Sequence, residues 1–303
     1  MLRIQQFLKE SEPILALIGA LLSLTVLGFL VKLFLIMKEA MSQRIKVLEE
    51  KSAVKEERRL KELEDRQRAE RERDELKKQL TSILGQEKVT IESLVENPAL
   101  NTITNEVKNA VKNVLQEMQQ IEDDVEPPAK DPKEHLELAK AATVAGAWLT
   151  AAKHYDKYVR KYPDNWEIHF LRAVAYANIR GDNTTDLASL RAYGDAISLA
   201  PKELNQNTQS RLHTYRGAML KRLKRLDEAL SELQLAQKWA SESYEVIDNY
   251  YNLACVYAMK KDKENMMKCL SQLSLSPPYK HTVKRSVYFK DYWDDEDFLD
   301  WSE

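Results

Sequence analysis

The stretch YRGAMLKRLKRLDEALSELQLAQKWA, residues 215–240, decides the fold. Gly217 is followed twelve residues later by Ala229 and seven residues after that by Ala236. Small and aromatic residues return at matching offsets with a period of about 34 residues. Small residues allow two helices to cross closely, and larger residues fill the space between neighbouring helix pairs. Four such pairs between Lys133 and Lys280 predict an all-α solenoid over residues 133–280.

The other copies repeat this pattern with variations. The first contains GAWLTAAKHYDKYVRKYPDN, residues 146–165, and the fourth contains YYNLACVYAMKKDKENMMKCLSQLSLSPP, residues 250–278, with Met266 in place of a small residue. The second has four extra residues around RGDNTTDL, residues 180–187, which we expect in the turn between its helices. These segments resemble the tetratricopeptide (TPR) repeat family over roughly half of the chain. The resemblance implies a protein-binding solenoid of about four repeats.

In this family the first helix of each pair lines a concave groove, so the resemblance implies that a partner binds there. The candidate partner-binding residues on that face are Lys140, Phe170, Asn178, Arg211, Lys221, Arg222 and Tyr251. The basic residues among them favour an acidic or acidic-aromatic peptide as the ligand. The alternative is that they only solvate the surface. Leu136 and Lys140 stand where the family's carboxylate clamp has Lys and Asn, so that clamp is not supported.

Aromatic residues are unevenly distributed along the 303-residue chain. All tryptophans and tyrosines lie at or after Trp148, and the region from Met37 to Ala147 has no aromatic residue. Little material for a globular core is present there. The sequence therefore predicts one compact domain from about Asp131 onward.

Composition and motifs give no sign of catalysis. The net charge of −2 gives no nucleic-acid footprint. The five histidines lack metal-ligand spacing, and no nucleotide-binding or nucleophile motif is present. Cys255 and Cys269 lie among apolar residues and are expected to be core thiols. We expect no enzyme activity, no cofactor and no metal.

The N-terminal region predicts a membrane anchor. After a short segment at residues 1–13, the run from Ile14 to Val31 carries no charge, and Lys32 is followed by LFLIM. As one helix, residues 14–37 measure about 36 Å, enough to span a bilayer. A cleaved signal peptide is the alternative. The excess of Lys and Arg after the run predicts a single-pass membrane protein whose C-terminal domain lies in the cytosol.

Two further helices are expected before the repeats. Residues 38–84 contain no Pro or Gly and many charges of both signs, which predicts a charged helical stalk. Residues 98–121 carry an apolar stripe that must be buried, against the first repeat, a second copy of the chain or a membrane surface. Homo-oligomerisation could thus use the stalk or this helix. Residues 122–132 form an acidic, proline-broken linker.

The C-terminal residues 281–303 are rich in acidic and aromatic side chains. Solenoids need a terminal cap, so capping the last repeat is the expected role. The alternative is an exposed recognition peptide, which could fold back into the groove.

Together these features predict a membrane-anchored scaffold for protein–protein interactions that recruits a partner through a TPR groove. Two alternatives remain open. One is an envelope-assembly or chaperone-type protein with its repeats outside the cytosol. The other is a non-catalytic sensory subunit of a multi-chain complex.

Overall fold

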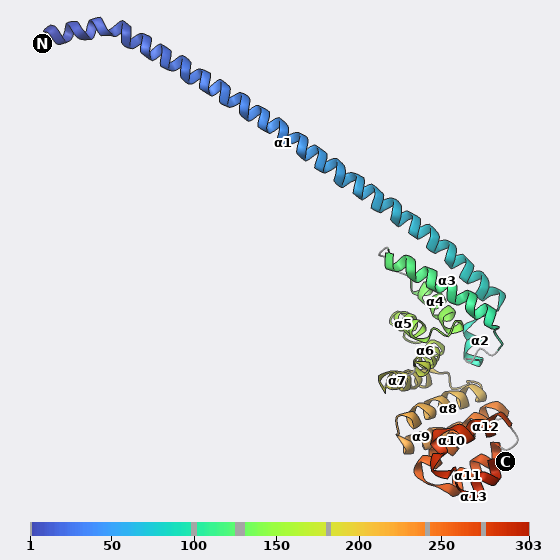
Figure 1. The fold of residues 1–303 in the computed structure, drawn as a ribbon. Helices are drawn as coiled ribbons and strands as arrows, with labels where there is room; N and C mark the ends of the chain where they lie inside the picture. Colours follow the sequence, from blue (N-terminus) through green and yellow to red (C-terminus); the bar gives the residue numbers. More distant parts are fainter. Residues whose placement is uncertain are drawn as a thin grey trace. The chain divides into compact units, whose positions relative to one another are not determined.

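The computed structural model describes residues 2–97, 102–124, 131–179, 183–239, 243–273 and 277–302, and these residues form an all-α fold (Figure 1). The chain divides into two compact units, residues 1–69 and residues 70–303. The first unit is a stretch of a single helix. The second contains the repeats and is where tertiary packing is found.

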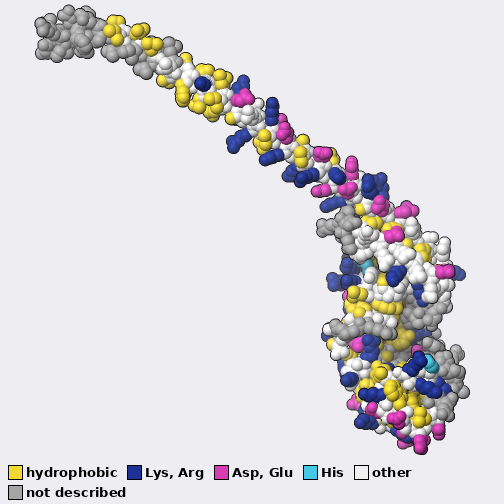
Figure 2. Space-filling view, viewed as in Figure 1, with side chains coloured by type: hydrophobic (Ala, Val, Ile, Leu, Met, Phe, Trp, Pro, Cys, Tyr) yellow, Lys and Arg dark blue, Asp and Glu magenta, His cyan; other side chains and the backbone are white. Residues whose placement is uncertain are grey.

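Helix α1 runs from Leu2 to Gln86. The sequence predicted three segments here, at residues 1–13, 14–37 and 38–84, whereas the structure has one uninterrupted helix. Figure 2 shows positive and negative side chains interleaved along its charged part. Pairs of opposite charge one helical turn apart support an exposed helix, which explains its continuity without a core.

The predicted membrane anchor is wrong. Among the residues that the structure describes, no helix carries an apolar stretch long enough to cross a membrane. Lys32 interrupts the apolar side chains within residues 14–37, and Lys38 and Glu39 follow them directly; a charge in a hydrocarbon core carries a large free-energy cost. The anchor at residues 14–37 and the single-pass membrane placement with a cytosolic C-terminal domain are both withdrawn.

The second unit continues α1 with a succession of shorter helices. They are α2 (Ile91–Glu96), α3 (Asn105–Asp124), α4 (Pro132–Val144), α5 (Trp148–Val159), α6 (Trp166–Asn178), α7 (Asn183–Leu199), α8 (Gln206–Arg222), α9 (Leu226–Trp239), α10 (Ser243–Lys260), α11 (Lys263–Leu273), α12 (Pro277–Arg285), the 3₁₀ helix η1 (Val287–Tyr292) and α13 (Glu296–Ser302). Helices α4 to α11 form four consecutive pairs, and each pair packs on the next.

The turn inside three of the pairs has the same geometry. Gly146, Lys224 and Lys261 adopt left-handed backbone conformations, with φ of 68°, 59° and 62°. The residue after each of them donates its amide to the carbonyl five residues earlier, at 2.8 to 2.9 Å. This bond closes the first helix of the pair and reverses the chain. The repeating unit read from the sequence is therefore a repeating unit of the structure.

In three of the helix pairs, the first helix begins just after a residue whose side chain caps it. Asp131, Asn165 and Asn205 precede α4, α6 and α8, and the side-chain oxygen of each accepts a backbone N–H of the first turn. The bonds measure 2.8 to 3.0 Å. Amides of the first turn have no partner within the helix, so these bonds fix where each helix starts.

Helix α3 corresponds to the helix expected at residues 98–121, of which residues 98–101 lie outside the described part of the chain. Its apolar stripe is buried inside the chain, with Val111 and Met118 at 0% and 2% exposure, and α3 packs on α4. The stripe is thus covered without a second copy or a membrane. Within the predicted linker, residues 125–130 lie outside the described residues.

The last turns of α1 belong to the same unit as the repeats. Leu76, Leu80 and Leu84 are buried there. Arg73 forms an ion pair with Glu134 of α4, and Lys77 contacts the same carboxylate at 2.9 Å. Charged and apolar contacts together hold the end of α1 against the first repeat.

The C-terminal segment packs on the last pair of helices, with η1 against α10 and α13 against α11. Phe289 and Phe298 are buried at 0% and 2% exposure. The Trp301 indole Nε1 donates to the Leu270 carbonyl at 2.8 Å. Lys263 of α11 pairs with two carboxylates of the segment at 2.7 Å. Apolar and polar contacts therefore join the segment to the last repeat.

Candidate functional site

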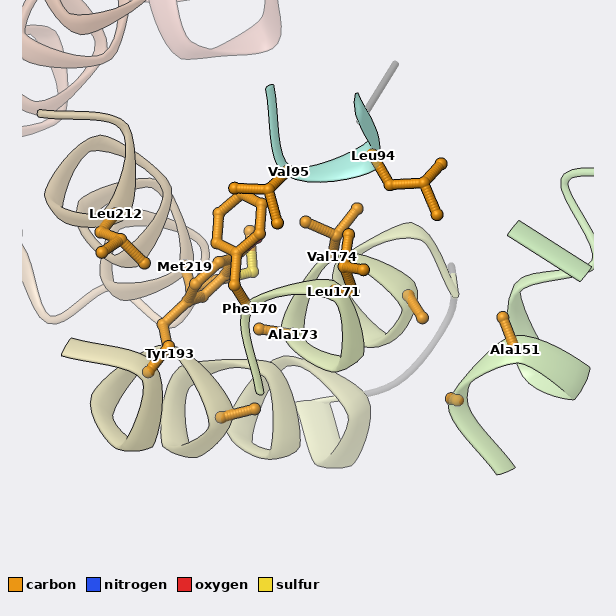
Figure 3. Packing of buried hydrophobic residues seen from close by; sticks show 14 of the residues in the cluster. Leu94, Val95, Ala151, Phe170, Leu171, Ala173, Val174, Tyr193, Leu212 and Met219 are labelled. Carbon is orange, nitrogen blue, oxygen red and sulfur yellow. The ribbon is translucent and has the colours of Figure 1, made fainter. Parts of the chain in front are cut away.

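The short helix α2 lies on the first helix of the second repeat, α6. Leu94 and Val95 are 0% and 5% exposed. Figure 3 shows them directed towards α6, where Phe170, Leu171 and Val174 lie nearby. A segment outside the repeats thus occupies part of the face on which the sequence placed a partner.

The polar contacts of α2 reach the two neighbouring first helices. Arg211 of α8 donates through Nη1 to the Val95 carbonyl at 2.6 Å. On the other side, Lys140 of α4 is close enough to Glu92 to interact with its charge. Helices α4, α6 and α8 therefore form one surface around α2, which we call the α2 site.

Two carboxyl groups meet at this site. A backbone amide and then the Thr90 hydroxyl donate to Glu92 and lower its pKa, and Lys140 adds to the effect. Glu167 at the start of α6 has a raised pKa, because it is partly buried and because the charge of Glu92 is near. The α2 site thus contains one favourable and one unfavourable charge contact with Glu92.

Beside α2 an open pocket of about 450 Å³ lies between α6 and α8. Its walls are mainly aromatic and aliphatic, and an amide and a guanidinium are among the polar groups. The lining residues are Trp148, Val174, Ala177, Asn178, Tyr193, Tyr215, Ala218, Met219 and Arg222. We call this the α6/α8 pocket. Val174 contributes to both the pocket and the packing near α2, so the two are neighbours.

Helix pairs with a recurring turn and a groove on their first helices are the architecture of TPR proteins. The chain resembles this family. The TPR resemblance expected from the sequence is therefore confirmed, as a likeness of fold. No protein-family model and no curated protein matches the sequence.

Solved structures to which this chain is similar have low sequence identity to it, and the similarity covers most of their own length. MamA is 15% identical, with a TM-score of 0.44, over 56% of this chain and 85% of MamA. YrrB, described as a TPR protein with an unusual peptide-binding site, is 16% identical, with a TM-score of 0.42, over 65% of this chain and 92% of YrrB. TTC0263 from Thermus thermophilus is 16% identical, with a TM-score of 0.41, over 68% of this chain and 99% of TTC0263.

Two of the seven candidate partner-binding residues line the α6/α8 pocket. Asn178 donates through Nδ2 to the Val174 carbonyl at 2.9 Å. Arg222 pairs with the Asp186 carboxylate at 2.5 Å and donates to the Ala177 carbonyl at 2.7 Å. Both side chains are held in place by the repeat itself. A ligand in the pocket would meet fixed polar groups.

Phe170 lies elsewhere than expected. It is fully buried, and its ring stacks on Tyr215 at a centroid distance of 6.0 Å and meets Tyr193 edge-on at 5.9 Å. Such aromatic packing stabilises the contact between two repeats. Phe170 thus supports the floor under α2 and is not exposed to a ligand in the groove.

Lys221 and Tyr251 lie beneath the C-terminal segment. The Lys221 ammonium donates to the Asn252 side-chain oxygen at 2.7 Å and lies 4.6 Å from the centroid of the Tyr288 ring. The Tyr251 hydroxyl donates to the Ser286 hydroxyl at 3.3 Å. This end of the groove is therefore covered by the chain's own residues.

The four candidate basic residues do not converge on one open surface. Lys140 pairs with Glu137 at 2.8 Å, and Arg211 bonds to α2. Arg222 lies at the α6/α8 pocket, and Lys221 lies under Tyr288. Since each already has an intramolecular partner, an acidic ligand would have to displace an existing contact.

Helix α2 cannot be recognised from a periodic pattern, because its six residues are too few to show one. One local signal was available. The Thr90 hydroxyl accepts the Ser93 amide at 3.1 Å, and the Ser93 hydroxyl accepts the Thr90 amide at 2.9 Å. Thr is a common residue at the N-cap of a helix, and here Ser93 takes the place that Glu or Gln usually has in a capping box. The preceding Lys88, at a φ of 51°, ends α1 with the same left-handed turn as the repeats.

Burial of Lys221 predicts a pH dependence that a variant can remove. The side chain is 5% exposed, and burial lowers its pKa. Between the lowered and the ordinary pKa, the unfolded chain binds more protons than the folded chain, so stability rises with pH. We expect the stability of the parent to rise relative to that of Lys221→Met between about pH 9 and about pH 10, just below the ordinary pKa of lysine, when the free energy of unfolding is measured in urea.

The buried acids that face Lys221 contribute a slope of the opposite sign. Burial raises the pKa values of Tyr251, Tyr288 and Cys255, so the unfolded chain loses these protons first and their contribution to stability falls as the pH rises. These groups are present in both the parent and Lys221→Met, so the difference between the two chains reports on the ammonium. Arg222 keeps its charge throughout. An unchanged pH slope in Lys221→Met would show that the burial of this ammonium does not govern stability in that range.

Proposed function

We propose that this chain is a protein–protein interaction scaffold that binds a peptide segment of a partner on its first helices. The observation that carries the proposal is the open α6/α8 pocket, whose aromatic and aliphatic walls surround two fixed polar groups. Apolar pockets with a few oriented polar groups are typical binding sites, and aromatic side chains are common anchors at interfaces. The TPR-like fold is consistent with this role.

The polar groups suggest how a ligand would be oriented. Asn178 and Arg222 are fixed by their own contacts, so a bound peptide would not have to order them. The Arg222 side chain is still 30% exposed despite its pairing with Asp186. We propose that it meets a carbonyl or carboxylate of the partner, while an apolar partner side chain enters between Trp148 and Tyr215.

We propose binding without catalysis. Cys255 and Cys269, the most nucleophilic side-chain type, are both buried in the described structure. Burial raises the pKa of both thiols, to about 12 for Cys269. The reactive thiolate is therefore scarce at neutral pH. The proposed role rests on the shape of the groove and not on reactive groups.

Filling the α6/α8 pocket should abolish binding. Ala218 lines the pocket and is partly exposed, so a larger side chain can occupy the space. Peptides selected from a random display library on the full chain should bind Ala218→Trp at least about tenfold more weakly than the parent. Affinity is measured by fluorescence anisotropy of labelled, selected peptides.

The matched control is Ala110→Trp, the same substitution at an exposed position of α3. It should leave peptide affinity unchanged, and both variants should keep the helical circular dichroism spectrum of the parent. The proposal fails if no peptide is enriched above background. It also fails if enriched peptides bind Ala218→Trp as tightly as they bind the parent.

A further inference from the structure

Helix α2 contacts the groove as a bound peptide would. It comes from outside the repeats, and the residues it joins, Val95 and Arg211, are 116 positions apart in the chain. It presents two adjacent aliphatic side chains to α6 and buries both. Its C-terminal carbonyl accepts a guanidinium, which also complements the negative end of a helix.

The contacts of α2 define the chemistry that the α2 site selects. Leu171 and Val174, at 1% and 5% exposure, provide an apolar floor. Lys140 lies close enough to Glu92 to interact with its charge, and Arg211 lies at the C-terminal end of α2. The site therefore fits a one-turn to two-turn helix that carries a carboxylate and, two residues later, a pair of aliphatic side chains.

Several features make α2 a weak occupant. A helix of six residues is not stable by itself, so its structure depends on the surface beneath it. Glu92 also approaches Glu167, whose pKa is raised by its burial and by this second carboxyl group. Like charges oppose docking. A partner helix that is longer than α2 and makes more apolar contacts would compete well.

We propose that α2 is an internal ligand of the α2 site, and that the partner recruited by the scaffold is a short acidic-aliphatic helix that displaces it. This inference rests on the proposed function and adds the class of ligand and its competitor. The neighbouring α6/α8 pocket would then take the continuation of the partner chain, because Val174 borders both.

The test uses the full chain with α2 released from its site. Leu94→Asp with Val95→Asp places two charges where the site is apolar, so α2 should leave it. A fluorescently labelled peptide of residues 88–97, KVTIESLVEN, is then titrated into parent and variant chains. We expect the variant to bind it at least about tenfold more tightly, because the parent site is already occupied.

Two controls link the binding to the α2 site. A peptide carrying both Asp substitutions should not bind either chain. Adding Arg211→Gln to the released variant should weaken binding of the unmodified peptide several-fold, since the bond to the Val95 carbonyl is lost. If Arg211→Gln has no effect, the peptide binds elsewhere and the proposal is overturned.

Three results would overturn the proposal directly. The folded double variant could fail to bind the peptide, or the parent and the variant could bind it equally. Sedimentation could instead show that the parent chain is a dimer that exchanges α2 between copies, which would make a second copy the occupant. If the double variant does not fold, Leu94→Ala replaces it, and equal affinity of Leu94→Ala and the parent overturns the proposal.

The result separates this inference from the proposed function. The Ala218→Trp variant tests whether binding of the selected peptides requires the α6/α8 pocket. This test is independent of whether the 88–97 peptide binds. If the selected peptides bind but the 88–97 peptide does not, the inference that α2 is an internal ligand is wrong, while the proposed scaffold function still holds.

Discussion

We expect Gly217→Leu to destabilise the repeat domain by about 2 to 3 kcal/mol, because it overfills a close helix crossing. A Cβ atom on Gly217 would lie 2.7 Å from Leu233 Cγ and 3.4 Å from the Ala229 carbonyl oxygen. Leu233 is fully buried and has little room to move. The loss should appear as a lower urea midpoint with an unchanged slope.

Two further substitutions test whether the loss of stability comes from the close helix crossing at Gly217. Gly194 also lies within a helix, but no atom approaches within 4 Å of the position of its Cβ. Gly194→Leu should therefore be neutral or slightly stabilising, since Leu favours helices more than Gly does. Leu233→Ala should recover part of the loss in Gly217→Leu, as a double-mutant cycle would show. Equal effects at Gly194 and Gly217 would contradict the close crossing.

Gly217 also shows which part of the fold is readable from the sequence. Its offsets to Ala229 and Ala236 come from contacts between adjacent helices, and such contacts recur with each repeat. Local pairing of this kind leaves a periodic trace in the sequence. The helix pairs and the TPR resemblance could be predicted for this reason.

The candidate site was less readable, and Phe170 shows why. Helix α6 is apolar on nearly all sides, with Ile168, Phe170, Leu171, Ala173 and Val174 all buried. A periodic pattern then cannot distinguish the face towards the groove from the face towards the next repeat. The TPR resemblance assigned Phe170 to the face of α6 that lines the groove, whereas the structure places its side chain in the packing between repeats.

Occupancy of the groove could not be predicted at all. The bond between Arg211 and the Val95 carbonyl joins residues from different parts of the chain and involves a backbone atom. The cover of Lys221 by Tyr288 likewise depends on how the C-terminal segment returns to α8. Such long-range contacts have no fixed spacing, so a single sequence does not reveal them.

The C-terminal segment should prove to be part of the fold. We expect Phe289→Ala to lower the free energy of unfolding by about 3 to 5 kcal/mol, the range for removing a fully buried aromatic side chain. Val287→Ala, two residues earlier and 69% exposed, is the matched control and should change stability by less than about 0.5 kcal/mol. Both values are measured by urea unfolding of the full chain.

Deleting residues 287–303 distinguishes a cap from a displaceable ligand. The deletion uncovers the apolar end of the last repeat and removes Tyr288 from above the buried Lys221 ammonium. We therefore expect partial unfolding and loss of α10 and α11 from the cooperative transition. A ligand that only occupied the groove would leave the repeats intact when removed, as we expect for α2. A stable, fully helical deletion variant that binds peptides more tightly would show that this segment is also an internal ligand and would contradict its role as the cap.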